Sequence, residues 1–238
     1  MSNIKQLLFT MIFCFQIANA DTITLITDRD NTLYEIDDGS LSNGIGSYIF
    51  AGSTGANGVR RSLLHFDLSP IPAGSIVNAV KLSMYMDKTK AGASILSVHR
   101  VLTDWGEGES SASGGEGSGG LAAENDATWL HSFYANKLWN QPGGDYKADS
   151  SSDMIVADEG IYTWSNTGLI EDVKYWLESP DLNFGWAIIG DESKTSTAKR
   201  FISRNFSDPD LHPRLVIDYT PDIKTVIQEK SWAELKEK

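Results

Sequence analysis

The sequence predicts an all-β fold: a jelly-roll-like antiparallel β-sandwich with one short crossover helix and a C-terminal helical tail. Three observations support this prediction. Short segments alternate apolar and polar residues, turn residues separate these segments, and one stretch has helical spacing. The clearest alternation lies in residues 60–86, where two such runs flank the sequence Pro-Ile-Pro-Ala-Gly. Side chains alternate between the faces of a strand, so each run has one apolar face and one polar face.

The remaining strands follow from the same alternation. We expect a first strand at residues 21–27, with residues 31–36 as its continuation, and a short apolar strand at residues 48–51. Another strand is expected at residues 94–102. Four closing strands are expected at 161–164, 186–189, 200–204 and 214–219.

One segment has the spacing of an amphipathic helix. Leu169, Ile170, Val173, Trp176 and Leu177 lie on one face of a helix over residues 169–178. Asn166 or Thr167 can cap its start, and a Ser-Pro pair ends it.

The chain divides into three parts. Residues 1–20 are expected to be a secretory signal peptide, with a positive Lys5, an apolar core and a small-x-small cleavage site at Ala18-Asn19-Ala20. Residues 21–220 form the sandwich domain, and residues 221–238 form a charged amphipathic tail. Within the domain, the glycine- and serine-rich residues 110–120 are expected to be a mobile surface loop.

The expected leader implies a secreted or extracellular protein, with the periplasm as the open alternative. No membrane span is expected after its removal, because no second long apolar run follows. The only cysteine, Cys14, lies within the leader, so the domain is held by its core without disulfides.

Charge narrows the class of partner. The net charge is −12 for the whole chain, and loss of Lys5 with the leader makes it −13, which argues against nucleic acid as a partner. Carboxylates also suit a structural calcium ion, although none has EF-hand spacing. These candidate residues are Asp28, Asp30, Asp37, Asp38, Asp126, Asp191 and Glu192.

Basic residues fall in or beside the predicted strands, whereas the acidic residues lie mostly in loops. Guanidinium groups bind carboxylates through paired hydrogen bonds, so several arginines on one sheet face suit a carboxylated ligand. For any single arginine, an ion pair with Asp67, Asp218 or another carboxylate is the favoured interpretation, and the ligand hypothesis rests on the arginines as a group. Tryptophans near irregular segments add an aromatic surface for sugar stacking. The candidate ligand residues are Arg60, Arg61, Arg100, Arg200, Arg204 and Trp105.

Motifs of several common enzyme classes are missing: the G-x-S-x-G elbow, the H-E-x-x-H helix, the P-loop and the dinucleotide-binding glycine motif. His65 and Asp67 share one strand face, which leaves a Tyr/His/Arg lyase site open. A structural pairing of His65 with Asp67 is the favoured interpretation.

Four blocks of sequence resemble the DNRLRE domain family of secreted bacterial proteins. They are RRSLLHFDLSPIPAGSIVNAVKLSMY, HRVLTDWGEGES, LNFGWAIIGDE and KRFISRN with HPRLVIDY. The resemblance covers residues 22–219, with Asn205 where the family's naming motif has glutamate. It implies a jelly-roll-like sandwich and a non-catalytic role. Some members resemble carbohydrate-binding modules for acidic polysaccharides such as alginate, which points to Arg200 and Arg204 as ligand residues.

The leading hypothesis is therefore a secreted, non-catalytic β-sandwich that binds extracellular polysaccharide, with an acidic polymer as the class that its arginines suit. A structural or adhesive cell-surface or matrix protein is the alternative. A polysaccharide-degrading enzyme ranks third.

Overall fold

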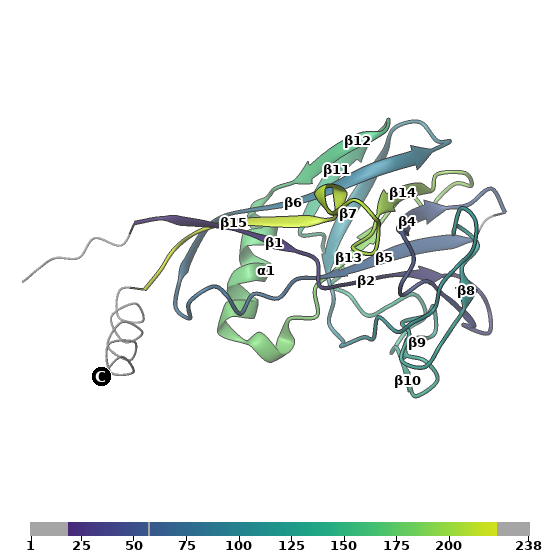
Figure 1. Ribbon diagram of the computed structural model, residues 1–238, viewed down its shortest axis with the longest axis horizontal. Coiled ribbons are helices and arrows are strands. Elements are labelled where there is room, and N and C mark those ends of the chain that lie inside the picture. Colours follow the sequence, from purple (N-terminus) through teal and green to yellow (C-terminus); the bar gives the residue numbers. More distant parts are fainter. Residues whose placement is uncertain (1–18, 57, 223–238) are drawn as a thin grey trace, which may run out of the picture.

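The computed structural model describes residues 19–56 and 58–222. Antiparallel strands and one helix make up the fold (Figure 1). Most of the expected signal peptide and of the charged tail lies outside the described residues. The strands are β1 (Asp21–Ile26), β2 (Arg29–Tyr34), β3 (Leu41–Ser42), β4 (Tyr48–Ser53), β5 (Val59–His65), β6 (Ile76–Thr89), β7 (Ser94–Arg100), β8 (Gly120–Leu121), β9 (His131–Phe133), β10 (Lys137–Leu138), β11 (Ser152–Val156), β12 (Gly160–Trp164), β13 (Trp186–Ile189), β14 (Lys199–Ile202) and β15 (Arg214–Thr220).

The main sheet curls into two layers, which confirms the predicted all-β sandwich-like fold. One layer, sheet A, contains β1, β15, β6, β12 and β14, and the other, sheet B, contains β2, β5, β13, β7 and β11. Strand β4 joins them, because it pairs with β14 along most of its length and with β5 at Gly52 and Ser53. Gly52 has a φ of +110°, and a Cβ there would approach Thr197 and Ala198 to about 3 Å, so this bend requires glycine.

Strand β6 is the central strand of sheet A. On one edge it pairs with β15 and then with β14, and on the other edge with β12. Its alternate residues Val80, Leu82, Met84 and Met86 are buried in the core between the layers. The alternation in the sequence therefore predicted its inner face correctly.

The expectation that residues 31–36 continue the first strand is wrong. Strand β2 belongs to sheet B, where it pairs with β5 from Arg29 opposite His65 onward. The chain changes sheets at Thr27, whose hydroxyl donates to the backbone oxygens of His65 and Arg29. Two alternating segments in sequence thus lie in different layers, because a side-chain bond at the junction redirects the backbone.

The α-helix of the described residues, α1 (Thr167–Glu178), confirms the predicted crossover helix. The Asn166 side chain caps it by accepting from the Thr167 N–H. Leu169, Val173 and Trp176 enter the core, and Trp176 packs edge-on against Trp186 of β13 at 4.6 Å between ring centroids. Among the described residues, no helix is long and apolar enough to cross a membrane.

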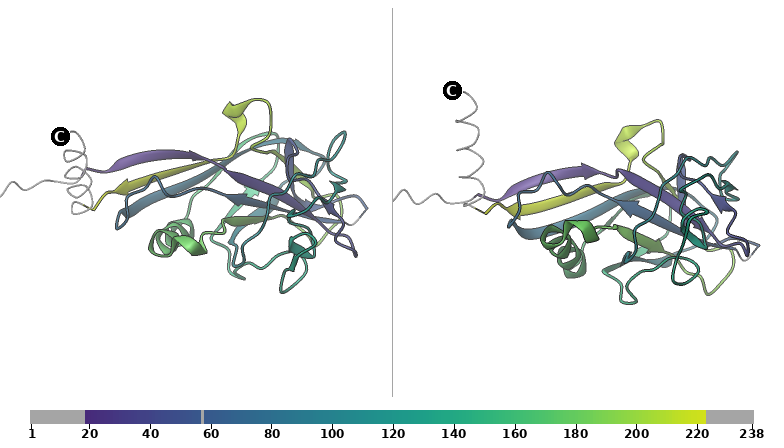
Figure 2. Two further views of the ribbon diagram at one scale, coloured as in Figure 1. Left: turned by 60° about the horizontal axis from the view of Figure 1, so that its bottom comes forward. Right: turned by 90° about the horizontal axis from the view of Figure 1, so that it is seen from below.

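The segment between β7 and β11 covers part of the outer face of sheet B with a second, smaller core. Leu33, Leu63 and Ala187 of sheet B meet Trp105, Trp129 and Trp139 there. Sequence analysis found no strand in this segment, yet β9 and β10 pair and β11 extends the sheet beside β7. The two views in Figure 2 show this segment (teal) at the end of the molecule away from the start of β1 and the end of β15.

Residues 110–120, expected from their composition to be a mobile surface loop, make defined contacts with the fold. The Glu116 carboxylate accepts from Asn43 Nδ2 and from the Ser47 and Tyr48 N–H groups at 2.9–3.2 Å. The Tyr34 hydroxyl donates to the Glu116 carbonyl, and Arg60 donates to that of Gly117. A single glutamate therefore anchors a segment whose composition is typical of disorder.

We predict that Asp172→Ala destabilises the fold by about 3–5 kcal/mol, because it removes the acceptor from several buried donors. Asp172 is buried in α1, accepts from Ser151 Oγ and from Trp186 Nε1, and lies 3.6 Å from Arg100. Urea unfolding of the purified protein measures the loss. Its neighbour Glu171 is exposed, so Glu171→Ala is the control and is expected within about 0.5 kcal/mol of wild type. Equal effects of the two variants would contradict this role.

Candidate functional site

Most of the arginines predicted to bind a ligand instead bind carboxylates of the protein. Arg61 forms two hydrogen bonds of 2.8 Å with Glu192, and Arg200 forms two with Asp87. Arg204 forms two with Glu107, at 2.6 and 2.7 Å. Each guanidinium is neutralised by a residue distant in sequence, which is the interpretation that sequence analysis favoured for any single arginine, although it proposed the arginines as a group for ligand binding.

The arginines also lie in separate places, which corrects the expectation of one basic sheet face. Arg60 and Arg61 are adjacent in β5 and point in opposite directions: Arg60 stacks on Tyr34, and Arg61 stacks on Trp129. Arg60 is 8% exposed and donates to two backbone oxygens, and burial lowers the pKa of its guanidinium. Arg100 is stacked on Tyr175 beside α1, at 4.1 Å.

Trp105 is fully buried, so it cannot stack on a sugar. Its Nε1 donates to the Phe184 backbone oxygen at 2.8 Å, and Arg29 covers its ring. Trp129 and Trp139 are also buried, in the second core. The irregular backbone around these tryptophans suggested exposure, but each ring fills space between the covering segment and sheet B.

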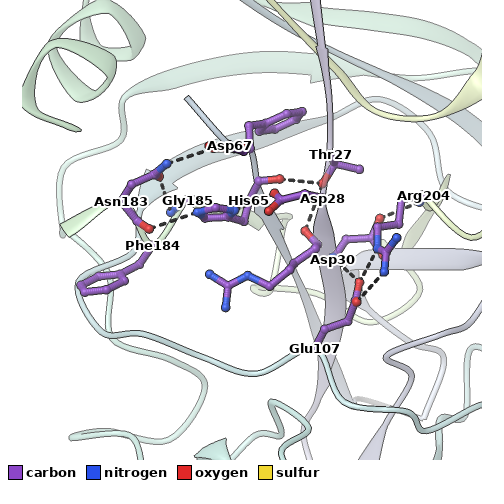
Figure 3. Close-up of polar contacts among 12 residues, drawn as sticks. Thr27, Asp28, Asp30, His65, Asp67, Glu107, Asn183, Phe184, Gly185 and Arg204 are labelled. Atoms are coloured by element: carbon purple, nitrogen blue, oxygen red, sulfur yellow. Dashed lines mark hydrogen bonds and ion pairs between the residues drawn. The ribbon is translucent and has the colours of Figure 1, made fainter. Parts of the chain in front are cut away.

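A polar cluster joins β2 to Glu107 and Arg204 (Figure 3). Asp30 is buried, and its Oδ2 accepts from the Arg204 N–H at 2.7 Å, while Glu107 accepts from the Asp30 N–H. Burial, which is the largest effect, raises the pKa of Asp30 to about 8, and the charge of Glu107 acts in the same direction. Asp30 is therefore mostly protonated at neutral pH, and Arg204 has a single full negative partner, Glu107.

His65 pairs with Asp28, not with Asp67 as the sequence suggested. Its Nδ1 lies 2.6 Å from Asp28 Oδ1, and its Nε2 lies 3.1 Å from the Asn183 backbone oxygen (Figure 3). Asp67 instead accepts from the backbone and hydroxyl of Ser69. Both ring nitrogens are occupied, so neither is directed at a substrate in this arrangement.

A groove of about 500 Å³ lies where sheet A meets the glycine-rich loop. Its lining includes Lys88 and Lys90 at the end of β6, Arg200 on β14 and Phe50 on β4. Lys88, Arg200 and Phe50 are direct neighbours across three paired strands. Charged groups and an aromatic ring therefore lie side by side on one face.

A β-bulge shapes this groove. Phe201 pairs with Met86 and Arg200 pairs with Lys88, so Asp87 is the additional residue on β6. Asp87 binds Arg200, while Lys88 and Lys90 are exposed, and their ammonium groups have no ion pair or hydrogen bond with a described residue. Arg200 also lies over the Tyr48 ring, at 3.7 Å. The cations free for a ligand are thus the two lysines.

The wall of the groove is the loop that Glu116 anchors. Gly115 and Gly117 line it, and a Cβ added at Gly117 would lie 3.6 Å from the Phe50 ring. On the two sides of the groove, Glu116 and Ser196 have φ values of +63° and +62°, which is uncommon for residues with a side chain. Such backbone is often found at functional sites, so this groove is the candidate ligand site.

The carboxylates considered for calcium are dispersed. Among residues 19–56 and 58–222, no group of three or more His, Cys, Asp or Glu side chains is placed to hold a metal ion. Asp126, for example, accepts from the Ala123 N–H and, at 3.4 Å, from the Ser110 N–H.

Sequence analysis missed Lys88, Lys90 and Phe50 as candidate residues. In the alternating run that becomes β6, Lys88 and Lys90 fall at the positions of the buried residues Met84 and Met86, and only the bulge at Asp87 turns Lys88 to the outer face. Only the pairing of β6 with β14 and β4 brings Arg200 and Phe50 beside them.

Comparison with known proteins adds no family to these observations. A scan against protein-family models gives no match, and a search of curated proteins gives none.

We predict that the protonated Asp30 makes stability decrease with rising pH. The folded state retains a proton up to about pH 8 that the unfolded chain loses near the ordinary pKa of 3.8, so the unfolding free energy falls between these values. Asp30→Asn keeps an acceptor for Arg204 but cannot titrate, so the decrease between pH 5 and pH 8 is expected to be smaller in this variant. Urea unfolding at both pH values measures it.

The control for this prediction is Asp38→Asn, because Asp38 is exposed and its pKa is lowered by hydrogen bonds from Ser40. This variant is expected to keep the wild-type pH dependence between pH 5 and pH 8. Identical pH dependence in wild type and Asp30→Asn would show that Asp30 is ionised throughout this range.

Proposed function

We propose that the protein is a non-catalytic module that binds an acidic extracellular polysaccharide in the groove beside residues 110–120. The observation that carries the proposal is the pair of exposed lysines, Lys88 and Lys90, whose ammonium groups have no partner within the described part of a chain whose net charge is −12. A carboxylated polymer gains attraction at this basic site, while the negative net charge of the chain disfavours binding at its acidic surfaces.

The composition of the groove supports a sugar ligand. Phe50 offers a small apolar surface, and Ser53, Thr54, Thr89 and Ser196 contribute polar groups around it. The groove is open to solvent on one side and formed by paired strands and an anchored loop. A largely preformed site loses little conformational entropy on binding.

The state of the histidines supports a role without catalysis. Both ring nitrogens of His65 are occupied. The Nδ1 of His131 lies 3.1 Å from the Thr128 hydroxyl, and its ring packs against Tyr134. Neither histidine lines the groove. The resemblance to the DNRLRE domain family of secreted proteins agrees with this proposal, and Arg200, one of the two residues it suggested, lies in the groove.

Substitution of the lysines tests the proposed function. The double variant Lys88→Ala/Lys90→Ala is expected to bind alginate or polygalacturonate at least about tenfold more weakly, because two charge-assisted contacts are lost. The wild-type affinity is expected to fall with added salt. Affinity electrophoresis and isothermal titration calorimetry of the protein without residues 1–20 provide the measurement.

The matched control is Lys147→Ala/Lys174→Ala, which changes the net charge equally at two exposed lysines outside the groove. It is expected to bind like wild type. Equal losses in both double variants would show that only the overall charge matters, and no binding by wild type to any acidic polymer would overturn the proposed function.

A structural or adhesive role is the second candidate, and one surface feature favours it. Ile95 of β7 and Ile155 of the edge strand β11 are direct cross-strand neighbours, and they are 58% and 65% exposed. Adjacent exposed isoleucines beside an unpaired strand edge form a surface suited to protein contact.

We predict that Ile95→Ser/Ile155→Ser weakens any self-association or partner binding of the protein without lowering its melting temperature markedly, since both side chains are exposed. Analytical ultracentrifugation over a concentration series measures self-association. A wild-type protein that is monomeric at all concentrations and captures no matrix protein would remove the support for this second function.

A further inference from the structure

We infer that the ligand surface extends from the groove along the outer face of β6 to a second subsite, so that the ligand is an internal segment of an acidic polymer spanning several sugar units. This inference rests on the proposed function. The outer face of sheet A carries a second hollow of about 220 Å³, and its lining includes Ser83, Tyr85, Ile161, Leu211, His212 and Arg214.

The two hollows lie on the same face of the same strand. The buried residues of β6 alternate with Lys81, Ser83 and Tyr85, which point outward, and the bulge at Asp87 leaves Lys88 exposed further along. At about 3.3 Å per residue, Tyr85 and Lys88 are separated by roughly 10 Å along β6. A ligand that contacts both is therefore longer than one sugar unit.

The second hollow has the composition of a sugar subsite. Ile161 of β12 is 69% exposed and is the direct cross-strand neighbour of Tyr85, so the two form an apolar shelf. Arg214 is the direct neighbour of Ser83 on the other edge of β6. Its Nη2 has only long contacts, 3.2 Å to the Pro209 backbone oxygen and 3.3 Å to the highly exposed Asp210, so a ligand carboxylate can compete with Asp210.

The loop between β14 and β15 bounds this surface on one side. The loop leaves sheet A at the end of β14 and returns to it at the start of β15. Figure 2 shows it projecting from the face opposite α1. Phe206 of this loop packs against Tyr48, and His212 Nε2 lies 2.8 Å from the Phe206 backbone oxygen. These contacts fix the position of the loop, so that it forms one side of the surface along which a polysaccharide chain would follow β6.

The charge of the outer face of β6 indicates which class of ligand binds there. Lys81, Lys88 and Lys90 are exposed cations along one strand, and none of them has a side-chain partner among the described residues. A polyanion with repeated carboxylates matches a row of separated cations better than a single small anion does. An acidic polymer is therefore the occupant that this face fits.

Dependence of affinity on ligand length tests the inference. The double variant Tyr85→Ala/Ile161→Ser is expected to bind long alginate oligosaccharides about tenfold more weakly than wild type does, while its affinity for disaccharides is unchanged. The groove variant Lys88→Ala/Lys90→Ala is expected to weaken binding of both. The control is Ile95→Ser/Ile155→Ser, which alters two similarly exposed apolar side chains on sheet B.

The outcomes separate this inference from the proposed function. Unchanged binding of long oligosaccharides by Tyr85→Ala/Ile161→Ser, with weakened binding by the groove variant, would overturn the second subsite alone. No binding of any oligosaccharide by wild type would overturn both. Should the variant Tyr85→Ala/Ile161→Ser fail to fold, Lys81→Glu provides the same test through charge, since Lys81 is exposed on this face.

Discussion

Ion pairs between half-buried arginines and carboxylates distant in sequence organise much of the molecule. Taking an unpaired charge out of water costs several kcal/mol, so strand arginines bind carboxylates carried by loops and neighbouring strands. The pair Arg61–Glu192 fastens the 190–193 turn to β5, and Arg204–Glu107 fastens the covering segment to the end of β14. The arginines thus hold the fold together and leave ligand binding to groups that remain in water.

Strand β6 connects this architecture to the proposed function. Its inner residues supply much of the core, and its outer residues present lysines, a serine and a tyrosine to solvent. Because one strand forms both surfaces, the outer groups inherit the rigidity of the core beneath them. At the bulge, Asp87 binds the Arg200 guanidinium, and the Lys88 side chain is left exposed without a partner among the described residues.

The glycine-rich loop shows how a few bonds can order a segment of low complexity. Glycine and serine bury little surface and give no reason for order by themselves. The contacts of Glu116 supply that reason, because its carboxylate accepts from three donors on the 43–48 segment, and Arg60 donates to the backbone oxygen of the next residue, Gly117. The result is a thin wall of backbone that lies close to Phe50 and narrows the groove.

The sequence by itself determined the elements: alternation predicted β5, β6, β13 and β15 closely, and helical spacing with an asparagine cap predicted α1. These signals are local, because the spacing of apolar residues within one strand or helix reveals its type without reference to the rest of the chain. Only the tertiary structure decided the partners, because Arg204 meets Glu107 and His65 meets Asp28 across long stretches of chain. Burial of Trp105 and the meeting of Lys88, Arg200 and Phe50 depended in the same way on how the strands pair, which no local pattern encodes.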